Sequence, residues 1–286
     1  MKGTSITEST RELIKKHDFK IAKKFGQNFL VDESVLKAIV DCSELSKEDC
    51  VLEIGPGMGV MTQVLCEKAG KVLAVEIDRE LMPILKVSLF GCDNVKVLND
   101  DILKLDLNMV LAENFGSIPV KVVANLPYYI TTPIIMKLLE ENINFKSITV
   151  MVQKEVGERL CASPGGKDYG AVTVAVQYRC IPNKILVVPP ESFIPQPEVD
   201  SMVIRLDSRD EPPVKLKDEK MYFRVVKASF GQRRKTLLNA LASGNLGKTK
   251  EELRSILLKH DIDEKRRGET LSLQEFASIA NELSKQ

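Results

Sequence analysis

Histidine is scarce in this chain, and its scarcity limits the chemistry available. The 286 residues include two histidines, His17 and His260, which the sequence pattern places on solvated helix faces. Imidazole is the most frequent general base in enzymes, and histidine and cysteine clusters are the usual zinc ligands. We therefore expect neither imidazole catalysis nor a metal site.

The chain also lacks paired cysteines and long apolar runs. Its six cysteines are scattered, with no C-x-x-C pair, as is typical of reduced thiols in a cytosolic protein. No apolar run reaches the ~18 residues that a membrane span requires. The N-terminal residues have no apolar segment behind Lys2, so they do not resemble a secretory signal. These absences predict a cytoplasmic protein that does not bind a membrane.

The charge is nearly balanced, with a formal net charge of +1, but it is unevenly distributed. Residues 1–24 hold seven lysines and arginines against three acids, and residues 221–240 hold five against none. Clustered cations on a balanced protein indicate binding to a polyanion. The second cluster includes Arg233, Arg234 and Lys235, which precede a helical pattern and are expected to contact the phosphates of a nucleic acid. Either cluster could instead be a solvated helix face.

Short apolar runs alternate with helical patterns over most of the chain, which predicts a mainly parallel, doubly wound α/β sheet. A polar linker with two prolines at 207–213 predicts a boundary between a domain over 1–206 and an all-helical domain over 214–286. The runs at 171–180, 185–189 and 202–206 are either final strands or a helix plus strands. Strands are expected near 50–54, 72–76, 95–98, 120–124 and 147–152. Helices are expected near 7–17, from Asp32 onward, and near 60–69, 79–89, 102–113, 132–141, 153–161, 218–229, 234–242, 250–259 and 272–284.

Glycines occupy alternate positions directly after the strand at 50–54. They follow Glu53 in the pattern E-x-G-x-G-x-G, and glycine lets the backbone turn sharply and approach a ligand closely. This spacing differs from the G-x-G-x-x-G of dinucleotide sites, so it favours a nucleoside without a pyrophosphate. S-adenosylmethionine is the obvious candidate. Glu76, at the end of the next strand, can accept hydrogen bonds from both ribose hydroxyls.

The most informative segment is Asn125-Leu126-Pro127-Tyr128, which ends the strand at 120–124. Ligands of open α/β sheets bind outside the carboxyl ends of the strands. The Asn125 side-chain oxygen and the Leu126 carbonyl can accept hydrogen bonds from the exocyclic amine of a nucleobase. Pro127 restricts the turn, and Tyr128 can stack on the base. The alternative is a proline turn that simply ends the strand, with Tyr128 as a core aromatic.

With these motifs in this order, the chain resembles the KsgA/RsmA family of small-subunit rRNA adenine dimethyltransferases from about residue 20 to 280. Residues 193–201 resemble the family's F-x-P-x-P-x-V-x-S motif, and residues 230–235 resemble the segment that opens its helical domain. Tyr129 departs from the asparagine of many members, and we expect activity to survive this. The resemblance implies that the cofactor is bound by Gln27, Asn28, Leu30, Glu53, Gly55, Gly57, Gly59, Glu76, Ile77, Asp101, Ile102 and Asn125. It implies that catalysis involves Asn125, Leu126, Pro127, Tyr128 and Phe193, with Phe193 closing over the second face of the base.

The resemblance also implies the reaction and the partner. Four methyl groups would pass from S-adenosylmethionine, leaving S-adenosylhomocysteine, to the N6 amines of two adjacent adenosines. These adenosines lie in a hairpin near the 3′ end of 16S rRNA, within a pre-formed small ribosomal particle. The implied protein is a monomeric cytoplasmic methyltransferase with a helical rRNA-binding domain and a role in ribosome biogenesis.

Two other functions stay open. A large-subunit rRNA adenine methyltransferase of the antibiotic-resistance type shares the fold and the turn, but the motifs at 193–201 and 230–235 favour the small-subunit family. A ribosome-assembly binding factor with a vestigial site is the second alternative, and intact Asn125, Tyr128 and Glu76 argue against it. The glycine spacing disfavours a dehydrogenase, and too little chain is left for the target-recognition domain of a DNA adenine methyltransferase.

Overall fold

The chain forms two compact units. The computed structural model describes residues 10, 12–13, 26–141, 143–232 and 234–284. The first unit takes the described residues up to Gly157 together with Pro182–Ser208, and the second takes Glu158–Ile181 together with the described residues from Arg209 onward. Most of the predicted helix at 7–17, nearly all of the basic segment at 1–24 and Arg233 lie outside the described residues.

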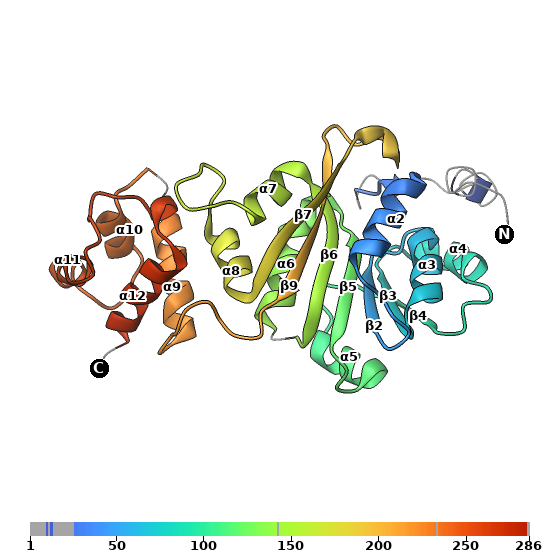
Figure 1. The fold of residues 1–286 in the computed structure, drawn as a ribbon, viewed down its shortest axis with the longest axis horizontal. Helices are drawn as coiled ribbons and strands as arrows, with labels where there is room; N and C mark the ends of the chain where they lie inside the picture. Colours follow the sequence, from blue (N-terminus) through green and yellow to red (C-terminus); the bar gives the residue numbers. More distant parts are fainter. Residues whose placement is uncertain (1–9, 11, 14–25, 142, 233, 285–286) are drawn as a thin grey trace. The chain divides into compact units, whose positions relative to one another are not determined.

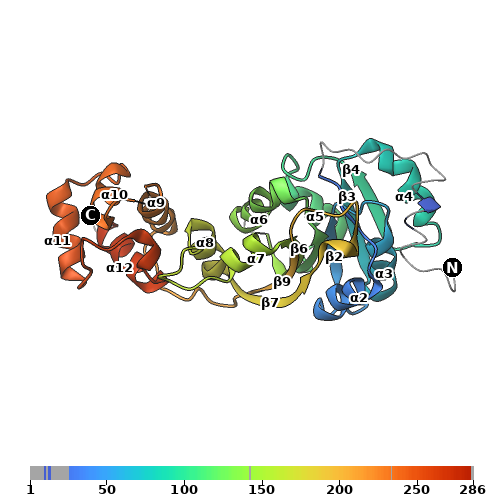
Figure 2. The same cartoon turned by 90° about the horizontal axis from the view of Figure 1, so that it is seen from above.

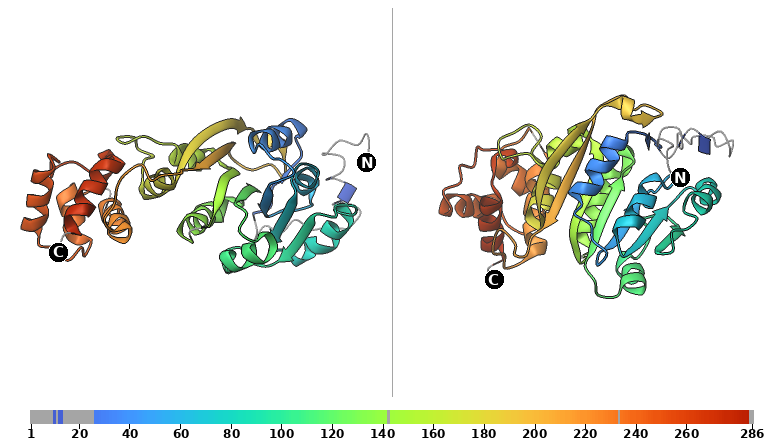
Figure 3. Two further views of the ribbon diagram at one scale, coloured as in Figure 1. Left: turned by 60° about the horizontal axis from the view of Figure 1, so that its bottom comes forward. Right: turned by 45° about the vertical axis from the view of Figure 1, so that its right-hand side comes forward.

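An open sheet is the centre of the first unit (Figure 1). Its described strands follow the order β4-β3-β2-β5-β6-β9-β7, with β2 to β6 parallel and β9 antiparallel to β6. Figure 3 shows the twist of these strands from two further sides. The strands are β2 (Cys50–Ile54), β3 (Lys71–Glu76), β4 (Val95–Asn99), β5 (Val120–Asn125), β6 (Phe145–Gln153), β7 (Cys180–Val188) and β9 (Ser201–Ser208).

Helices cover both faces of this sheet, with α2 and α3 on one side and α5 and α6 on the other (Figure 2). The predicted doubly wound α/β fold is therefore confirmed. Because both faces are covered, β2 is buried at every position and β5 at all but its last. The helices are α2 (Glu33–Cys42), α3 (Val60–Lys68), α4 (Met82–Ser88), α5 (Leu107–Phe115), α6 (Thr131–Glu140) and α7 (Lys154–Leu160).

Capping explains where two of these helices begin. Asp32 accepts from the backbone N–H groups of Ser34 and Val35 and caps α2, which therefore begins next to the residue where a helix was predicted to start. The helix expected from residue 102 begins only at Leu107. Asp101 first closes a tight turn, in which its carbonyl accepts from Lys104 N–H at 2.8 Å. Asp106 then caps α5, so the acidic residues divide what the pattern presents as one helix.

A small two-stranded sheet was not predicted. β1 (Phe29–Leu30) pairs antiparallel with β8 (Phe193–Ile194), and Val31 N–H donates to the Ser192 carbonyl at 2.9 Å. A strand of two residues is too short to show an alternating pattern. This pair holds two segments that are distant in the sequence beside each other, at the edge where β2, β3 and β5 end.

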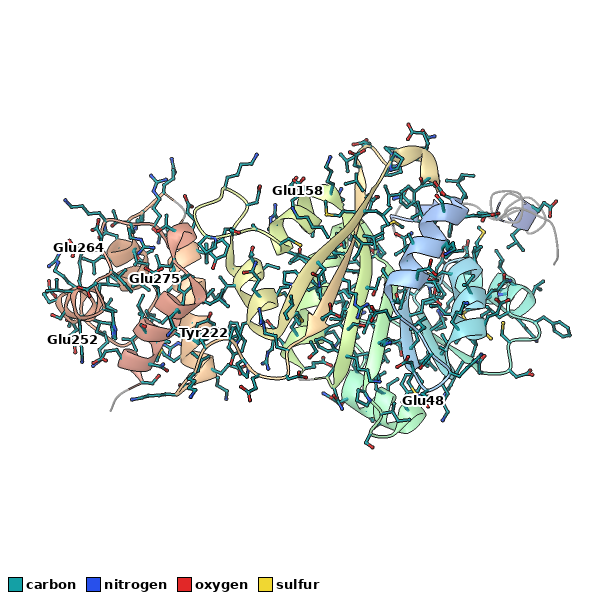
Figure 4. The ribbon with its side chains drawn as sticks, viewed as in Figure 1. Glu48, Glu158, Tyr222, Glu252, Glu264 and Glu275 are labelled. Atoms are coloured by element: carbon teal, nitrogen blue, oxygen red, sulfur yellow. The ribbon has the colours of Figure 1, made fainter. Side chains whose placement is uncertain are left out.

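The second unit is helical and has an aromatic core. Tyr169, Tyr222 and Phe276 are fully buried, and Figure 4 labels Tyr222 on α9. The unit takes in residues 158–181, which the linker-based boundary placed in the first domain, because Tyr169 and α8 pack into this core. The run at 171–188 is accordingly a helix followed by a strand. The helices are α8 (Ala171–Arg179), α9 (Glu219–Phe230), α10 (Leu237–Ser243), α11 (Lys250–Lys259) and α12 (Leu273–Leu283).

Candidate active site

The turn after β5 is held by several hydrogen bonds. Leu126 N–H donates to the Met151 carbonyl at 3.1 Å, which joins the turn to the neighbouring strand β6. The Pro127 carbonyl accepts from Thr131 Oγ1 at 3.0 Å and from Ile130 N–H at 3.2 Å. Pro127 itself has φ −60°, the value that its ring imposes. The turn is therefore fixed before any ligand arrives.

The orientation of the Asn125 amide follows from a single contact. Its Nδ2 donates to the main-chain carbonyl of Asn28 at 2.9 Å. A carbonyl oxygen can only accept, so the amide must present its NH2 group to it. The other end of the amide, Oδ1, accepts no hydrogen bond from the residues that the structure describes. Asn28 thus leaves Asn125 with a free acceptor at the end of β5.

Of the two predicted stacking aromatics, Tyr128 lines the cavity and Phe193 lies in the hydrophobic core. Tyr128 is half-buried, lines the cavity next to the turn, and shares a 2.5 Å hydrogen bond between its hydroxyl and Ser201 Oγ. Phe193 is 1% exposed and packs in the hydrophobic core with Val123 and Val203. The structure therefore does not place Phe193 in this cavity, where it was expected to close over a base. Its position in β8 turns its ring toward the sheet.

The three glycines after β2 all have positive φ, at +70° for Gly55, +59° for Gly57 and +83° for Gly59. A Cβ on Gly57 would lie 3.1 Å from the Phe29 ring. A Cβ on Gly59 would lie 2.7 Å from Ser88 Oγ, and Gly59 does not line the cavity. At these two positions the positive φ favours glycine, and a side chain would also displace its neighbours. Only at Gly55 is the space beside the backbone open, so this is where a ligand can approach the loop most closely.

Glu76 connects the glycine loop to the end of β3. Its carboxylate accepts from Gly57 N–H at 3.1 Å and from Asp78 N–H at 2.8 Å. Burial raises the pKa of Glu76 to about 6, and these two hydrogen bonds oppose the rise. Each carboxylate oxygen has a second lone pair, so the group can still accept from two ligand hydroxyls.

Glu53 is the most unusual group of the site. Its side chain is fully buried and lines the cavity, and neither carboxylate oxygen has a hydrogen-bond partner among the described residues. Burial raises the pKa of Glu53 to about 8; the nearby Thr62 hydroxyl opposes this rise, and the charge of Glu76 adds to it. Buried polar groups are normally paired, so an unpaired carboxyl on a cavity wall indicates a position that a ligand completes. A cationic or N–H donor fits it.

The remaining predicted cofactor residues also converge on this cavity. Gln27 Nε2 donates to Asp78 Oδ2 at 2.7 Å, which fastens the segment before β1 to the end of β3. Ile77 is 40% exposed and Ile102 is buried, so the pair forms an apolar patch on the wall. The predicted residues that line the cavity are Gln27, Asn28, Leu30, Glu53, Gly55, Gly57, Glu76, Ile77, Asp101, Ile102, Asn125, Leu126, Pro127 and Tyr128.

Sequence reasoning missed three features of the site. The Asn28 carbonyl orients Asn125, but main-chain groups carry no sequence signal. Ser201 holds the Tyr128 hydroxyl, and its place in the 193–201 motif was the available sign. Tyr129 lines the cavity and is 56% exposed, with its ring 3.2 Å from where a Cβ on Gly26 would lie. The sequence drew attention to Tyr129 only as a departure from a family pattern.

Two of the three predicted RNA-binding cations are described, and both are exposed. Arg234 and Lys235 precede α10 and form no ion pair with an acid in the described part of the chain. The second-unit arginines with a described ion pair, Arg179, Arg254 and Arg266, each pair with a glutamate. Arg234 and Lys235 are thus available to an external anion.

Within the described ranges, no three histidine, cysteine, aspartate or glutamate side chains are grouped in a way that could hold a metal ion. No helix in the same ranges is long and apolar enough to cross a membrane.

The fold and the site together define a class. A mainly parallel sheet has a cavity at the carboxyl ends of its strands, lined by Glu76 and by a glycine loop that differs from the dinucleotide fingerprint. This arrangement is that of the Rossmann-like methyltransferases. The Asn125-Leu126-Pro127-Tyr128 turn adds an amide oxygen without a described partner beside this cavity.

Comparisons with known proteins identify the family. The model of the ribosomal RNA adenine dimethylase family matches residues 18–285, and the chain belongs to this family of S-adenosylmethionine-dependent enzymes. The ribosomal RNA small subunit methyltransferase A of Alkaliphilus oremlandii is 53% identical, over 100% of this chain and 99% of its own length. The protein of the same name from Clostridioides difficile is 50% identical, over 98% of this chain and 97% of its own.

Solved structures agree with this assignment. A dimethyladenosine transferase from Plasmodium falciparum has a TM-score of 0.75 and 26% identity, covering 88% of this chain and 95% of its own. The 23S rRNA methyltransferase ErmE has a TM-score of 0.68 and 25% identity, covering 90% and 100%. The predicted family, fold and enzyme class are confirmed, whereas the roles of individual site residues stay predictions.

Proposed function

We propose that this protein transfers methyl groups from S-adenosylmethionine to the N6 amines of two adjacent adenosines in the 3′-terminal hairpin of 16S rRNA. The names of its relatives support the choice of the small subunit. The observation that carries the chemistry is the fixed Asn125 amide, whose Oδ1 is left free by the bond from Nδ2 to the Asn28 carbonyl.

The cavity fits this cofactor. Glu76 has acceptor capacity left for two ribose hydroxyls, and Gly55 leaves room for close approach. Asp101 and Ile102, which line the cavity, are proposed to contact the adenine ring. The unpaired Glu53 carboxyl suits the ammonium group at the amino-acid end. When bound, the cofactor supplies an electrophilic methyl group on a sulfonium centre.

The residues of the turn then act on the adenine. The lone pair of the amine is delocalised into the ring, so the amine is a weak nucleophile until it is reoriented. Asn125 Oδ1 and the Leu126 carbonyl, which accepts no hydrogen bond from the described residues, accept its two N–H groups and direct the lone pair toward the methyl group. Tyr128 stacks on the base, which contributes roughly 1–3 kcal/mol. No strong base is needed, because the proton can leave to water after transfer.

The second unit is proposed to bind rRNA within a small ribosomal particle, through Arg234, Lys235 and the neighbouring Arg233. Each phosphate contact releases counterions, so affinity should fall by ~0.7–0.9 log units per contact for each log unit of salt. Replacing the three cations with alanine should flatten this dependence and leave cofactor affinity unchanged. If the salt dependence of binding is unchanged, these cations do not contact rRNA and are solvent-exposed residues at the start of a helix. We further propose a cytoplasmic monomer with a role in subunit biogenesis.

The deciding experiment maps methylated adenosines after incubation with labelled S-adenosylmethionine. Small subunits from cells that lack this methylation and naked large-subunit rRNA are offered separately. Dimethylation of two adjacent adenosines in the small-subunit hairpin is expected. Methylation of the large-subunit RNA alone would favour the second candidate, a resistance-type enzyme. The structural similarity to the 23S rRNA methyltransferase ErmE is the observation that supports this candidate.

A further inference from the structure

Tyr128 is held at both ends. Its backbone lies in the short 3-10 helix Tyr128–Ile130 that follows the fixed turn. Its hydroxyl lies 2.5 Å from Ser201 Oγ, and it has no other hydrogen-bond partner among the described residues. Burial raises the pKa of the Tyr128 phenol, so it stays neutral and able to donate. Both the position and the tilt of the ring are therefore constrained.

The topology explains why Ser201 can reach this ring. β9 runs antiparallel to β6, and Ser201, its first residue, is the register partner of Gln153, the last residue of β6. The start of β9 thus lies at the same sheet edge as the ends of β5 and β6. Ser201 is itself fully buried, so its hydroxyl is fixed by the sheet and does not move with a surface loop.

We propose that Ser201 is a positioning residue that fixes the Tyr128 ring and thereby determines whether the enzyme completes the second methylation of each adenosine. This inference rests on the proposed roles of Asn125, Leu126 and Tyr128.

The two methylations depend unequally on the ring. In the first, the amine has two N–H groups, which can be bound by Asn125 Oδ1 and the Leu126 carbonyl. After it, one N–H has been replaced by a methyl group, so one of these hydrogen bonds is lost. The base is then oriented by one hydrogen bond and by stacking on Tyr128. A ring that is free to tilt should therefore slow the second transfer more than the first.

The test measures both transfers in single-turnover reactions on small ribosomal subunits, with saturating cofactor and mass spectrometry of monomethylated and dimethylated adenosine. We expect Ser201→Ala to slow the second transfer about fivefold more than the first, the size expected for loss of one hydrogen bond. Monomethylated adenosine should accumulate, and cofactor affinity should stay within twofold of wild type. Tyr128→Phe should give the same product ratio, and the double variant should be no worse than either single one. Ser201→Thr, which keeps the hydroxyl, should restore dimethylation.

A matched control separates positioning from stability. Ser147→Ala changes another buried serine of the same sheet, at the opposite end of β6, whose Oγ has no partner among the described residues. It should leave the product ratio unchanged. If Ser201→Ala and Tyr128→Phe slow both transfers equally, or leave the ratio at wild type, the inference is wrong. If Tyr128→Ala also methylates at the wild-type rate, the proposed role of Tyr128 fails as well.

Discussion

Both units of this molecule bury polar groups that have no partner among the described residues, but the settings differ. In the first unit, Glu53 lines the cavity at the carboxyl ends of the strands. In the second, the hydroxyls of Tyr169 and Tyr222 lie in an aromatic core, with the Tyr222 ring 5.3 Å from that of Phe223. Neither tyrosine lines the cavity.

The comparison shows what identifies a ligand site. Burial raises the pKa of Glu53 to about 8 and that of Tyr169 to about 12, so a perturbed pKa occurs in both units. The difference is the cavity, together with the groups that converge on it. An unsatisfied buried group indicates ligand binding only where space faces it. Elsewhere it is a cost that aromatic packing offsets.

The largest expected effect is the loss of methyl transfer at the first unit's cavity. Asn125→Ala removes the oriented acceptor, so methyl transfer should fall by about 100-fold or more, as for other preorganised groups that act in a transition state. Binding of the ribosomal particle should be largely retained, because the amide does not contact phosphates. Single-turnover assays at saturating cofactor measure this. Asn114→Ala on α5, whose amide donates to the Val110 carbonyl, is the control. Near-normal turnover of the Asn125 variant would contradict the mechanism.

The next effect concerns the cofactor. Glu76→Ala should weaken cofactor binding by about 1.5–3 kcal/mol, the range for hydrogen bonds to a charged group. It also frees the N–H groups of Gly57 and Asp78. Calorimetry of S-adenosylmethionine binding checks it. Glu80→Ala, an exposed acid in the turn after β3, should bind normally. Unchanged affinity in the Glu76 variant would remove Glu76 from the site.

A third prediction uses the pH dependence of stability. The folded-state pKa of Glu53 is raised from 4.5 to about 8, so the folded protein holds an extra proton between these values. Its contribution to the free energy of unfolding is therefore present at low pH and falls as pH rises, by at most about 1.4 kcal/mol per pH unit. The pKa of Glu76 is raised only to about 6, so Glu76 affects the pH dependence of stability only in the lower part of this range.

Denaturant unfolding of the cofactor-free protein between pH 6 and 8 tests this. Glu53→Gln should flatten the decline, and the variant should gain stability relative to wild type as pH rises. Equal slopes in the two proteins would mean that Glu53 is paired and ionised throughout.

The smallest effect tests the second unit. Tyr222→Phe removes a hydroxyl that has no partner among the described residues and keeps the ring, so stability should stay equal or rise by about 1 kcal/mol. Tyr178→Phe is the matched control, because its hydroxyl donates to Glu219 Oε2 at 3.2 Å and its loss should destabilise. Thermal unfolding compares them. A destabilised Tyr222 variant would show that its hydroxyl is satisfied in solution.

Much of the first unit could be predicted because its elements are long and periodic. Buried valine-rich strands such as 120–124 and helices with one apolar face have strong local signals. The cavity residues Gly55, Glu76 and Asn125 could be predicted to lie together, since the carboxyl ends of parallel strands meet at one edge. The boundary between the two units was harder to predict from the sequence. Tyr169 is a single aromatic in a glycine-rich loop, and only packing into the aromatic core assigns its segment to the second unit.

The amino-acid sequence by itself determined the succession of strands and helices along the chain, the class of cofactor and the turn from Asn125 to Tyr128, because each shows as short motifs or periodic runs in the sequence. Tertiary structure alone decided that the Asn28 carbonyl orients Asn125, that Ser201 holds Tyr128, and that Phe193 packs into the core and not over the cavity. The two hydrogen bonds join residues 97 and 73 positions apart. Local propensity says nothing about such pairs. They form only because an antiparallel final strand and a two-residue strand pair return distant segments to the edge where the parallel strands end.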